Sequence, residues 1–279
     1  MTATTFPTNV PTPGPALTPS LTRSRWSYAV SDATAVMWRN LLAYVRLPEM
    51  AVFSSIQPIM FVLLFRYVFG NSITLADPSI AYVDYLMPGI MVQTAVFGAM
   101  ATGIGLAEDL HKGLIERFRS LPMARSAVLA GRTMADSVRN VFVMALVTVV
   151  GMMVGFRIHD GLFRYLFAVA LVILFAFAVS WIAALVGLGA PNAEAAQAAM
   201  FPLLFPLIFA SSAFVDTSFM PGWLQAFANH QPVTYTVNAA RDLVLGLPAG
   251  ADVFASIAWS VGLVAVFAPL AVRRYRRAA

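Results

Sequence analysis

Six long apolar stretches, separated by segments that hold nearly all of the charge, make up most of this chain. A helix needs roughly 20 apolar residues to cross ~30 Å of hydrocarbon. The pattern therefore predicts an all-α membrane protein with six transmembrane helices. The uncharged part of the third stretch is short, so this helix is expected to begin near Met134. The predicted spans are residues 50–70, 85–107, 134–156, 165–190, 195–215 and 253–272.

The segments outside the spans have patterns of their own. Residues 1–22 contain five prolines and no charged side chain, which predicts a disordered cytoplasmic tail. Residues 23–47 combine apolar side chains at helical spacing with Trp26 and Trp38. This is typical of an amphipathic helix lying on the inner leaflet, although a soluble cytoplasmic helix is an alternative. Residues 48–279 then form the transmembrane domain.

Residues 216–252, before the last span, alternate prolines and glycines with short apolar pieces that include Trp223 and Phe227. Non-helical backbone at membrane depth persists only where protein or water satisfies it. We therefore predict a partly re-entrant extracellular helical hairpin. A seventh span would place the arginine cluster at residues 273–277 outside, against the charge rule described below.

Composition supports lipid as the solvent. Hydrophobic residues are 59% of the chain and charged residues 11%, too few charges for the surface of a soluble domain. The net charge of +5 comes from arginines beside the apolar spans, where anionic lipid headgroups explain them better than nucleic acid does. The chain has no cysteine, which excludes disulfides and thiolate ligands.

Lysine and arginine also predict the orientation, because they concentrate in cytoplasmic segments. Fourteen lie on the side of the two termini and three on the other. Both termini and the segment from Glu108 to Arg139 are therefore predicted to be cytoplasmic in a cell-membrane protein. Arg66, near the end of the first span, can reach headgroups. The fourteen are Arg23, Arg25, Arg39, Arg46, Lys112, Arg117, Arg119, Arg125, Arg132, Arg139, Arg273, Arg274, Arg276 and Arg277, and the three are Arg157, Arg164 and Arg241.

Catalytic and cofactor motifs were sought without success. The single lysine, Lys112, precedes a glycine and cannot complete a phosphate-binding loop. His111, His159 and His230 are far apart, and no G-x-S-x-G elbow occurs. We therefore predict a non-enzymatic chain with no catalytic, metal-binding or cofactor-binding residues.

Two stretches carry a recognisable pattern. They are EDLHKGLIERFRSLPMARSAVLAGR, from Glu108 to Arg132, and FPLLFPLIFASSAFVDTSFMPGWLQAFANHQPVTYTVNAARDLVLG, from Phe201 to Gly246. With YLMPGI at Tyr85–Ile90, they resemble the daunorubicin-resistance type of ABC-type-2 export permease, from about Trp38 to the C-terminus. The resemblance implies pairing with a second copy or a related permease, and docking of two separate ATPase subunits that bind ATP and Mg²⁺.

The resemblance also implies roles for particular residues. A cytoplasmic coupling helix, at Glu108–Leu121, would transmit closure of the ATPase, whereas the alternative is that its charges only anchor the loop to headgroups. Four residues before the last span would form an outer gate that helps to close the exit. The alternative is that these four residues only stabilise the fold and do not contact the cargo. Prolines would make the fifth span bendable. The implied coupling residues are Glu108, Asp109, Gly113, Glu116, Arg117, Arg119 and Pro122, and the implied outer gate is Pro221, Trp223, Pro232 and Arg241. The span hinge at Pro202 and Pro206 is predicted from the proline effect on the backbone and not from the resemblance.

Two positions depart from the family pattern. His230 and Gln231 stand before Pro232, where the family more often has asparagine directly before the proline. This departure weakens residue-level expectations for the outer loop. Arg66 occupies a position that is usually neutral, which indicates either snorkelling or an anionic cargo.

The resulting hypothesis is an ATP-driven exporter subunit that moves a hydrophobic or amphiphilic drug or lipid along a path between the first, second and fifth spans of two copies. A permease for a lipid-linked polysaccharide is one alternative. An ATPase-independent channel or secondary carrier is another, and would need a charged side chain at mid-depth in some span. A membrane enzyme is disfavoured because no catalytic constellation is visible. The identity of the cargo is not indicated by the sequence.

Overall fold

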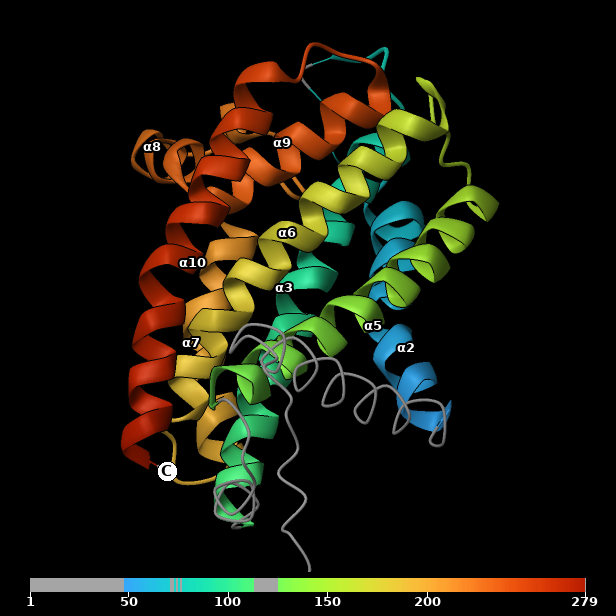
Figure 1. Ribbon diagram of the computed structural model, residues 1–279. Helices are drawn as coiled ribbons and strands as arrows, with labels where there is room; N and C mark the ends of the chain where they lie inside the picture. Colours follow the sequence, from blue (N-terminus) through green and yellow to red (C-terminus); the bar gives the residue numbers. More distant parts are fainter. Residues whose placement is uncertain (1–47, 71–72, 74, 76, 113–124, 279) are drawn as a thin grey trace, which may run out of the picture.

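The computed structural model describes residues 48–70, 73, 75, 77–112 and 125–278, and every regular element in this part of the chain is helical (Figure 1). The predicted tail at residues 1–22 and the predicted interfacial helix at residues 23–47 lie outside the described residues.

Each predicted span corresponds to one helical segment. The first is α2 (Pro48–Leu63), which continues directly into a π-helix, η1 (Leu64–Phe69). The others are α3 (Tyr82–His111), α5 (Arg125–Met153), α6 (Gly161–Gly187), α7 (Ala193–Phe209) and α10 (Gly250–Ala278). Between α7 and α10 lie the 3₁₀ turn η2 (Thr217–Phe219), α8 (Gly222–His230) and α9 (Pro232–Leu245).

Four of these segments are long and apolar enough to cross a membrane, namely Tyr82–His111, Gly131–Met153, Gly161–Gly187 and Gly250–Tyr275. Two apolar helices are shorter, Ser55–Phe69 and Ala193–Phe209. At 1.5 Å per residue, α7 reaches only about 25 Å. An all-α membrane protein is therefore confirmed, whereas the crossing of all six segments stays a prediction.

Two boundaries differ from the expected ones. α5 begins at Arg125, well before the expected Met134, because the charged side chains of its first half find partners on α3. α7 ends at Phe209 although the fifth span was predicted to reach residue 215. Residues 210–215 are non-helical but mostly buried, and side chains of the following hairpin satisfy their carbonyl groups.

α3 lies at the centre of the bundle and contacts α2, α5, α6, α7 and α9. Its approach to α6 is close, since a Cβ atom at Gly103 would overlap the Ala183 carbonyl and one at Gly187 would overlap the Gly103 carbonyl. Small residues at such positions let helices pack backbone to backbone, which is how helices associate in lipid. Two thirds of the apolar window of α3 is buried.

α10 is the opposite case, with only 11% of its apolar window buried. Large apolar side chains such as Phe254, Trp259 and Val261 are exposed along it. A continuous exposed apolar face of this kind marks contact with lipid or with another protein. Consecutive helices of the bundle run in opposite directions, so the end of α3, the start of α5 and the C-terminus lie at one end, and α8 and α9 at the other (Figure 1).

Candidate functional site

A row of matched polar contacts joins α3 to α5, and we call it the α3–α5 seam. Its members repeat at intervals of three or four residues on both helices, so they face each other along antiparallel helices. They are Gly98, Thr102, Gly105 and Asp109 on α3, and Arg132, Asp136 and Arg139 on α5.

The seam alternates ion pairs with hydrogen bonds. Arg132 pairs with Asp109, and the Thr102 hydroxyl donates to the Asp136 carboxylate. The Arg139 guanidinium lies 3.8 Å from Asp136 and donates to the Gly98 carbonyl oxygen at 2.6 Å. Since Asp136 and Arg139 are nearly buried, each charge depends on the other for its stability.

The seam adds contacts to residues 108–139, whose cytoplasmic location stays a prediction. Arg132 and Arg139 are helical, and both fall within the candidate membrane-spanning segment Gly131–Met153. The signal was available: Arg132, Asp136 and Arg139 fall at i, i+4 and i+7. The charge pattern alone does not show that this face of the helix pairs with α3.

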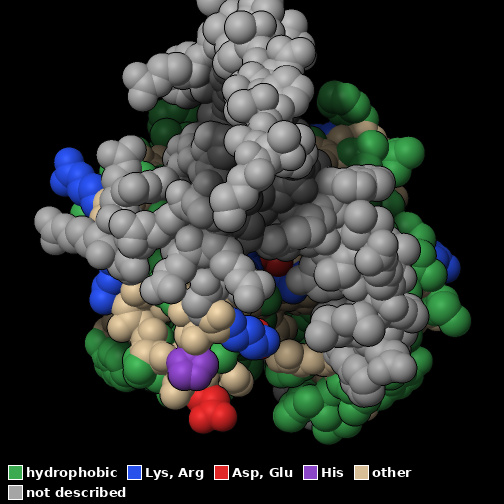
Figure 2. Space-filling view, turned by 60° about the horizontal axis from the view of Figure 1, so that its bottom comes forward, with side chains coloured by type: hydrophobic (Ala, Val, Ile, Leu, Met, Phe, Trp, Pro, Cys, Tyr) green, Lys and Arg blue, Asp and Glu red, His purple; other side chains and the backbone are tan. Residues whose placement is uncertain are grey.

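The end of α3 carries the first two residues of the implied coupling helix. Glu108 is exposed and forms an ion pair with Lys112 at 2.5 Å, while Asp109 turns toward Arg132. Gly113, Glu116, Arg117, Arg119 and Pro122 lie outside the described residues. Figure 2 shows this end of the molecule, where a few charged side chains are visible near the centre, others lie toward the edges, and hydrophobic ones occur around the rim.

A second polar cluster surrounds Arg241 at the opposite end of α3. The guanidinium donates to the carbonyl oxygens of Ser212 at 2.6 Å and Tyr85 at 3.1 Å, and to Asn238 Oδ1 at 3.1 Å. It also lies 3.5 Å above the centre of the Tyr85 ring, a favourable cation–π arrangement. Arg241 thus holds the non-helical residues after α7 against α3.

The four residues implied as an outer gate are not brought together. Arg241 is buried, whereas Trp223 is 76% exposed on α8. Pro221 is the N-cap residue before α8, and Pro232 is the first residue of α9, where the fixed φ of proline suits a helix start. A gating role for the four residues stays a prediction.

Sequence reasoning missed the role of Gln231. Its side-chain amide donates to the carbonyl oxygens of Leu207 at 2.8 Å and Ala210 at 2.6 Å, which are among the orphan acceptors at the end of α7. The departure from the family pattern before Pro232 is therefore a cap for the preceding helix. Arg66, the other departure, donates to the Val154 carbonyl oxygen at 3.4 Å.

Seven phenylalanines form a continuous stack along α7 and α2–η1, which we call the aromatic row. Phe209 connects to Phe214 with ring centroids 5.1 Å apart, and Phe214 stacks on Phe65 at 4.6 Å. Several members, such as Phe201 at 49%, are exposed. The row consists of Phe201, Phe205, Phe209, Phe214, Phe61, Phe65 and Phe69.

The two hinge prolines lie within α7, on the same helix as three members of the row. Pro202 and Pro206 are exposed and both interrupt the helical hydrogen-bond ladder. The helix continues past both prolines and ends at Phe209. The bending of α7 during a functional cycle stays a prediction.

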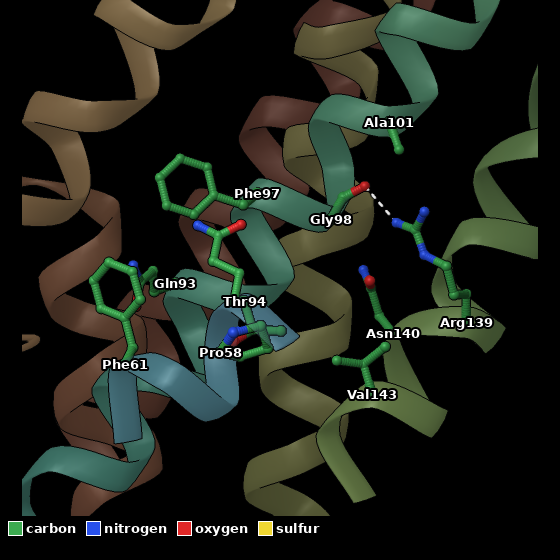
Figure 3. A pocket seen from close by; sticks show the side chains of 11 residues that line it. Pro58, Phe61, Gln93, Thr94, Phe97, Gly98, Ala101, Arg139, Asn140 and Val143 are labelled. Carbon is green, nitrogen blue, oxygen red and sulfur yellow. Dashed lines mark hydrogen bonds between the residues drawn. The ribbon is translucent and has the colours of Figure 1, made fainter. Parts of the chain in front are cut away.

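A cavity of about 180 Å³ opens between α2, α3 and α5, beside the row (Figure 3). Phe61 belongs to both the row and the cavity wall. Arg139 and Gly98, which form one end of the seam, make up another part of the cavity wall, as Figure 3 shows. The other lining residues are Gln57, Pro58, Gln93, Thr94, Phe97, Ala101, Asn140 and Val143.

Within the part of the chain that the structure describes, no group of three or more histidine and acidic residues is arranged to hold a metal ion. The site is instead a combination of an apolar wall, a small mixed-polarity cavity and a charged connection to one end of the bundle. Such an arrangement can bind an amphiphile and can transmit a displacement between helices.

Comparison with known proteins identifies relatives across most of the chain. The model of the ABC-2 type transporter family matches residues 32–245. The daunorubicin resistance ABC transporter permease protein DrrB1 of Streptomyces coeruleorubidus is 37% identical, over 89% of this chain and 87% of that protein. The probable doxorubicin resistance ABC transporter permease protein DrrC of Mycobacterium tuberculosis is 27% identical over 79% of each. A putative transport permease, ycf38, of Cyanophora paradoxa is 24% identical over 77% and 75%.

Proposed function

Because this chain belongs to the ABC-2 type transporter family, we propose that it is the transmembrane permease subunit of an ATP-driven exporter, acting with a separate ATPase subunit. Its cargo is a hydrophobic or amphiphilic drug or a lipid, moved out of the cytoplasm or the inner leaflet. The names of the relatives, which refer to daunorubicin and doxorubicin resistance, support a drug-type cargo.

The aromatic row is the observation that carries the choice of cargo. It offers a long apolar wall without a charged side chain, partly open at Phe201, Phe205 and Phe69. Stacking on such a wall is non-directional along its length, so an aromatic ring or acyl chain can move from one phenylalanine to the next. An ion would gain little there, because its hydrogen bonds to water would be lost without replacement. The C–H faces of a sugar ring can also stack on phenylalanine, so transport assays have to separate the polysaccharide alternative.

The α3–α5 seam supports a route for coupling. In the proposal, ATP closes two partner subunits, which push on residues 108–121 of two permease copies. Asp109 passes the displacement to Arg132 through their ion pair, and the remaining seam contacts move α5 with α3. α7 then bends at Pro202 and Pro206 and the row opens outward.

Reconstitution tests the function directly. The chain is co-purified with its candidate ATPase subunit and placed in vesicles with daunorubicin or a fluorescent phospholipid as probe. We expect ATP-dependent movement of at least one probe. Movement without ATPase would indicate a channel or carrier, and ATP-dependent movement of a lipid-linked oligosaccharide alone would indicate the polysaccharide alternative.

Charge reversal tests the coupling segment. Exchanging Glu116 and Arg117 (E116R/R117E) should abolish ATP-driven export while the protein still inserts, because a charged interface with the ATPase would be mismatched. The matched control exchanges Asp160 and Arg164, an exposed ion pair at the other end of the bundle, and should export normally. Normal export by both variants would contradict the coupling role.

A further inference from the structure

The cavity between α2, α3 and α5 has the size of one ring. Drug-sized sites usually enclose about 300–1,000 Å³, whereas this cavity has about 180 Å³. A cavity of about 150 Å³ is known to admit benzene. The space can therefore hold a single ring of a larger molecule whose remainder lies along the aromatic row, which it meets at Phe61.

One wall of the cavity carries an unsatisfied hydrogen-bonding group. Gln93 is 2% exposed, and both its amide nitrogen and its amide oxygen are buried without a partner. A buried amide whose NH₂ group and oxygen both lack a hydrogen-bond partner is unfavourable. The cost is larger within a membrane, where no bulk water is present to supply a partner. Gln93 lines this cavity, so a bound molecule, with the buried amide turned toward it, can supply the missing partner.

The charge at the opposite wall is already compensated. Arg139 bonds to the Gly98 carbonyl oxygen and lies 3.8 Å from Asp136. Thr94 donates its hydroxyl to the Ile90 carbonyl oxygen of its own helix at 2.7 Å. An anionic ligand would therefore compete with Asp136 for Arg139, whereas a neutral ligand leaves the seam intact.

We propose that this cavity is a cargo subsite for a neutral ring bearing a hydroxyl or carbonyl group, hydrogen-bonded by Gln93 and flanked by Phe61 and Phe97. The assignment rests on the proposed function and specifies the polar part of its cargo. Gln93 offers both a donor and an acceptor, so it distinguishes a ring with a polar substituent from a purely apolar ring of the same size.

Single-cysteine labelling measures occupancy of the cavity without the ATPase. The natural chain contains no cysteine, so Thr94→Cys places one thiol in the cavity wall. The rate of its alkylation is measured in the purified protein with phenol or toluene present, two probes of similar shape that differ by a hydroxyl in place of a methyl group. A control thiol at Met153→Cys, 81% exposed at the end of α5, should not be protected.

Phenol should protect Cys at position 94 at a concentration about tenfold lower in the Gln93 protein than in the Gln93→Met variant, the effect of one hydrogen bond. Toluene should protect both equally. Methionine fills a similar volume and removes an unpaired amide, so thermal unfolding should not shift downward. Gln197→Met, the same change at an exposed position of α7, should leave protection by phenol unchanged.

Equal protection by phenol in the Gln93 protein and the Gln93→Met variant would overturn the proposal, as would a clear loss of stability on Gln93→Met, which would mean that the amide has a structural partner. These results are separable from the transport assay. Protection that depends on Gln93 in a protein that exports nothing would leave the subsite in place and contradict the proposed function instead.

Discussion

The α3–α5 seam and the aromatic row are two ways of joining helices within one bundle, and they differ in almost every respect. The seam uses ion pairs and hydrogen bonds at fixed positions, with Gly105 leaving room for the Arg132 side chain and Gly98 for those of Asn140 and Arg139. The row uses ring stacking between α2–η1 and α7, with centroid separations from 4.2 to 6.5 Å and varied interplanar angles.

The difference indicates how one bundle can combine a rigid contact between α3 and α5 with a contact between α2–η1 and α7 that allows movement. Displacing the seam by one residue would leave buried charges unpaired, so α3 and α5 should move together. Sliding along the row exchanges one aromatic contact for another at little energetic cost. The row is thus suited to helix movement or to passage of a cargo, and the seam to force transmission.

The largest expected effect comes from breaking the seam at its buried pair. Asp136→Asn leaves the Arg139 charge without its carboxylate, and removing one partner of a buried pair typically costs about 3–5 kcal/mol. Unfolding in detergent should therefore shift to lower temperature. The double variant D136N/R139Q should recover most of the loss, and simple additivity of the two changes would show that the pair is not coupled.

A smaller and more selective effect is expected from the centre of the row. Phe214→Leu keeps an apolar side chain between Phe65 and Phe209 but removes stacking of about 0.5–1.5 kcal/mol. ATP-driven export of daunorubicin should fall by up to about tenfold, with little change for a phospholipid probe. Phe163→Leu, at an 86% exposed position of α6, is the control. Because Phe214 is itself buried, equal losses for both probes would mean that the variant disturbs the packing of the row and not the stacking of an aromatic cargo along it.

A modest effect is expected where the seam meets the coupling segment. Asp109 and Arg132 are partly exposed, so their pair is worth about 1 kcal/mol at most. Arg132→Asp should therefore reduce ATP-driven export more than it reduces stability. The exchange D109R/R132D re-forms the ion pair with its charges reversed and should restore part of the export activity. If the exchanged protein exports no better than Arg132→Asp, the ion pair has no part in coupling.

The smallest effect concerns the hairpin, outside both regions. Burial, together with the Asp252 carboxylate, raises the pKa of Asp242 on α9 to about 6. The protonated form is thus favoured in the folded state, and the associated stability is present below about pH 4 and lost as pH rises through 6. Because Asp242 is partly exposed, solvent screening reduces this effect, and the loss in the free energy of unfolding is less than about 1 kcal/mol. Asp242→Asn should abolish this part of the pH dependence of unfolding, while the seam variants retain it.

The sequence anticipated the helices better than their contacts. Apolar length located six segments, and each overlaps an observed helix. The end of α7 was misplaced because the apolar pattern continues past Phe209, and only Gln231 and Arg241, more than 20 residues later, show that the carbonyls there have side-chain partners. Arg241 was expected at the outer surface since charge alone does not reveal burial.

By itself, the amino-acid sequence determined that this chain is helical, that its solvent is largely lipid, and which family it belongs to, because apolar length and local motifs are properties of contiguous residues. Only the tertiary structure decided that Arg139 pairs within the bundle, that seven phenylalanines from two distant parts of the chain form one row, and that Gln93 borders a cavity. Each of these depends on contacts between residues far apart in the chain, which packing creates and which no local pattern specifies.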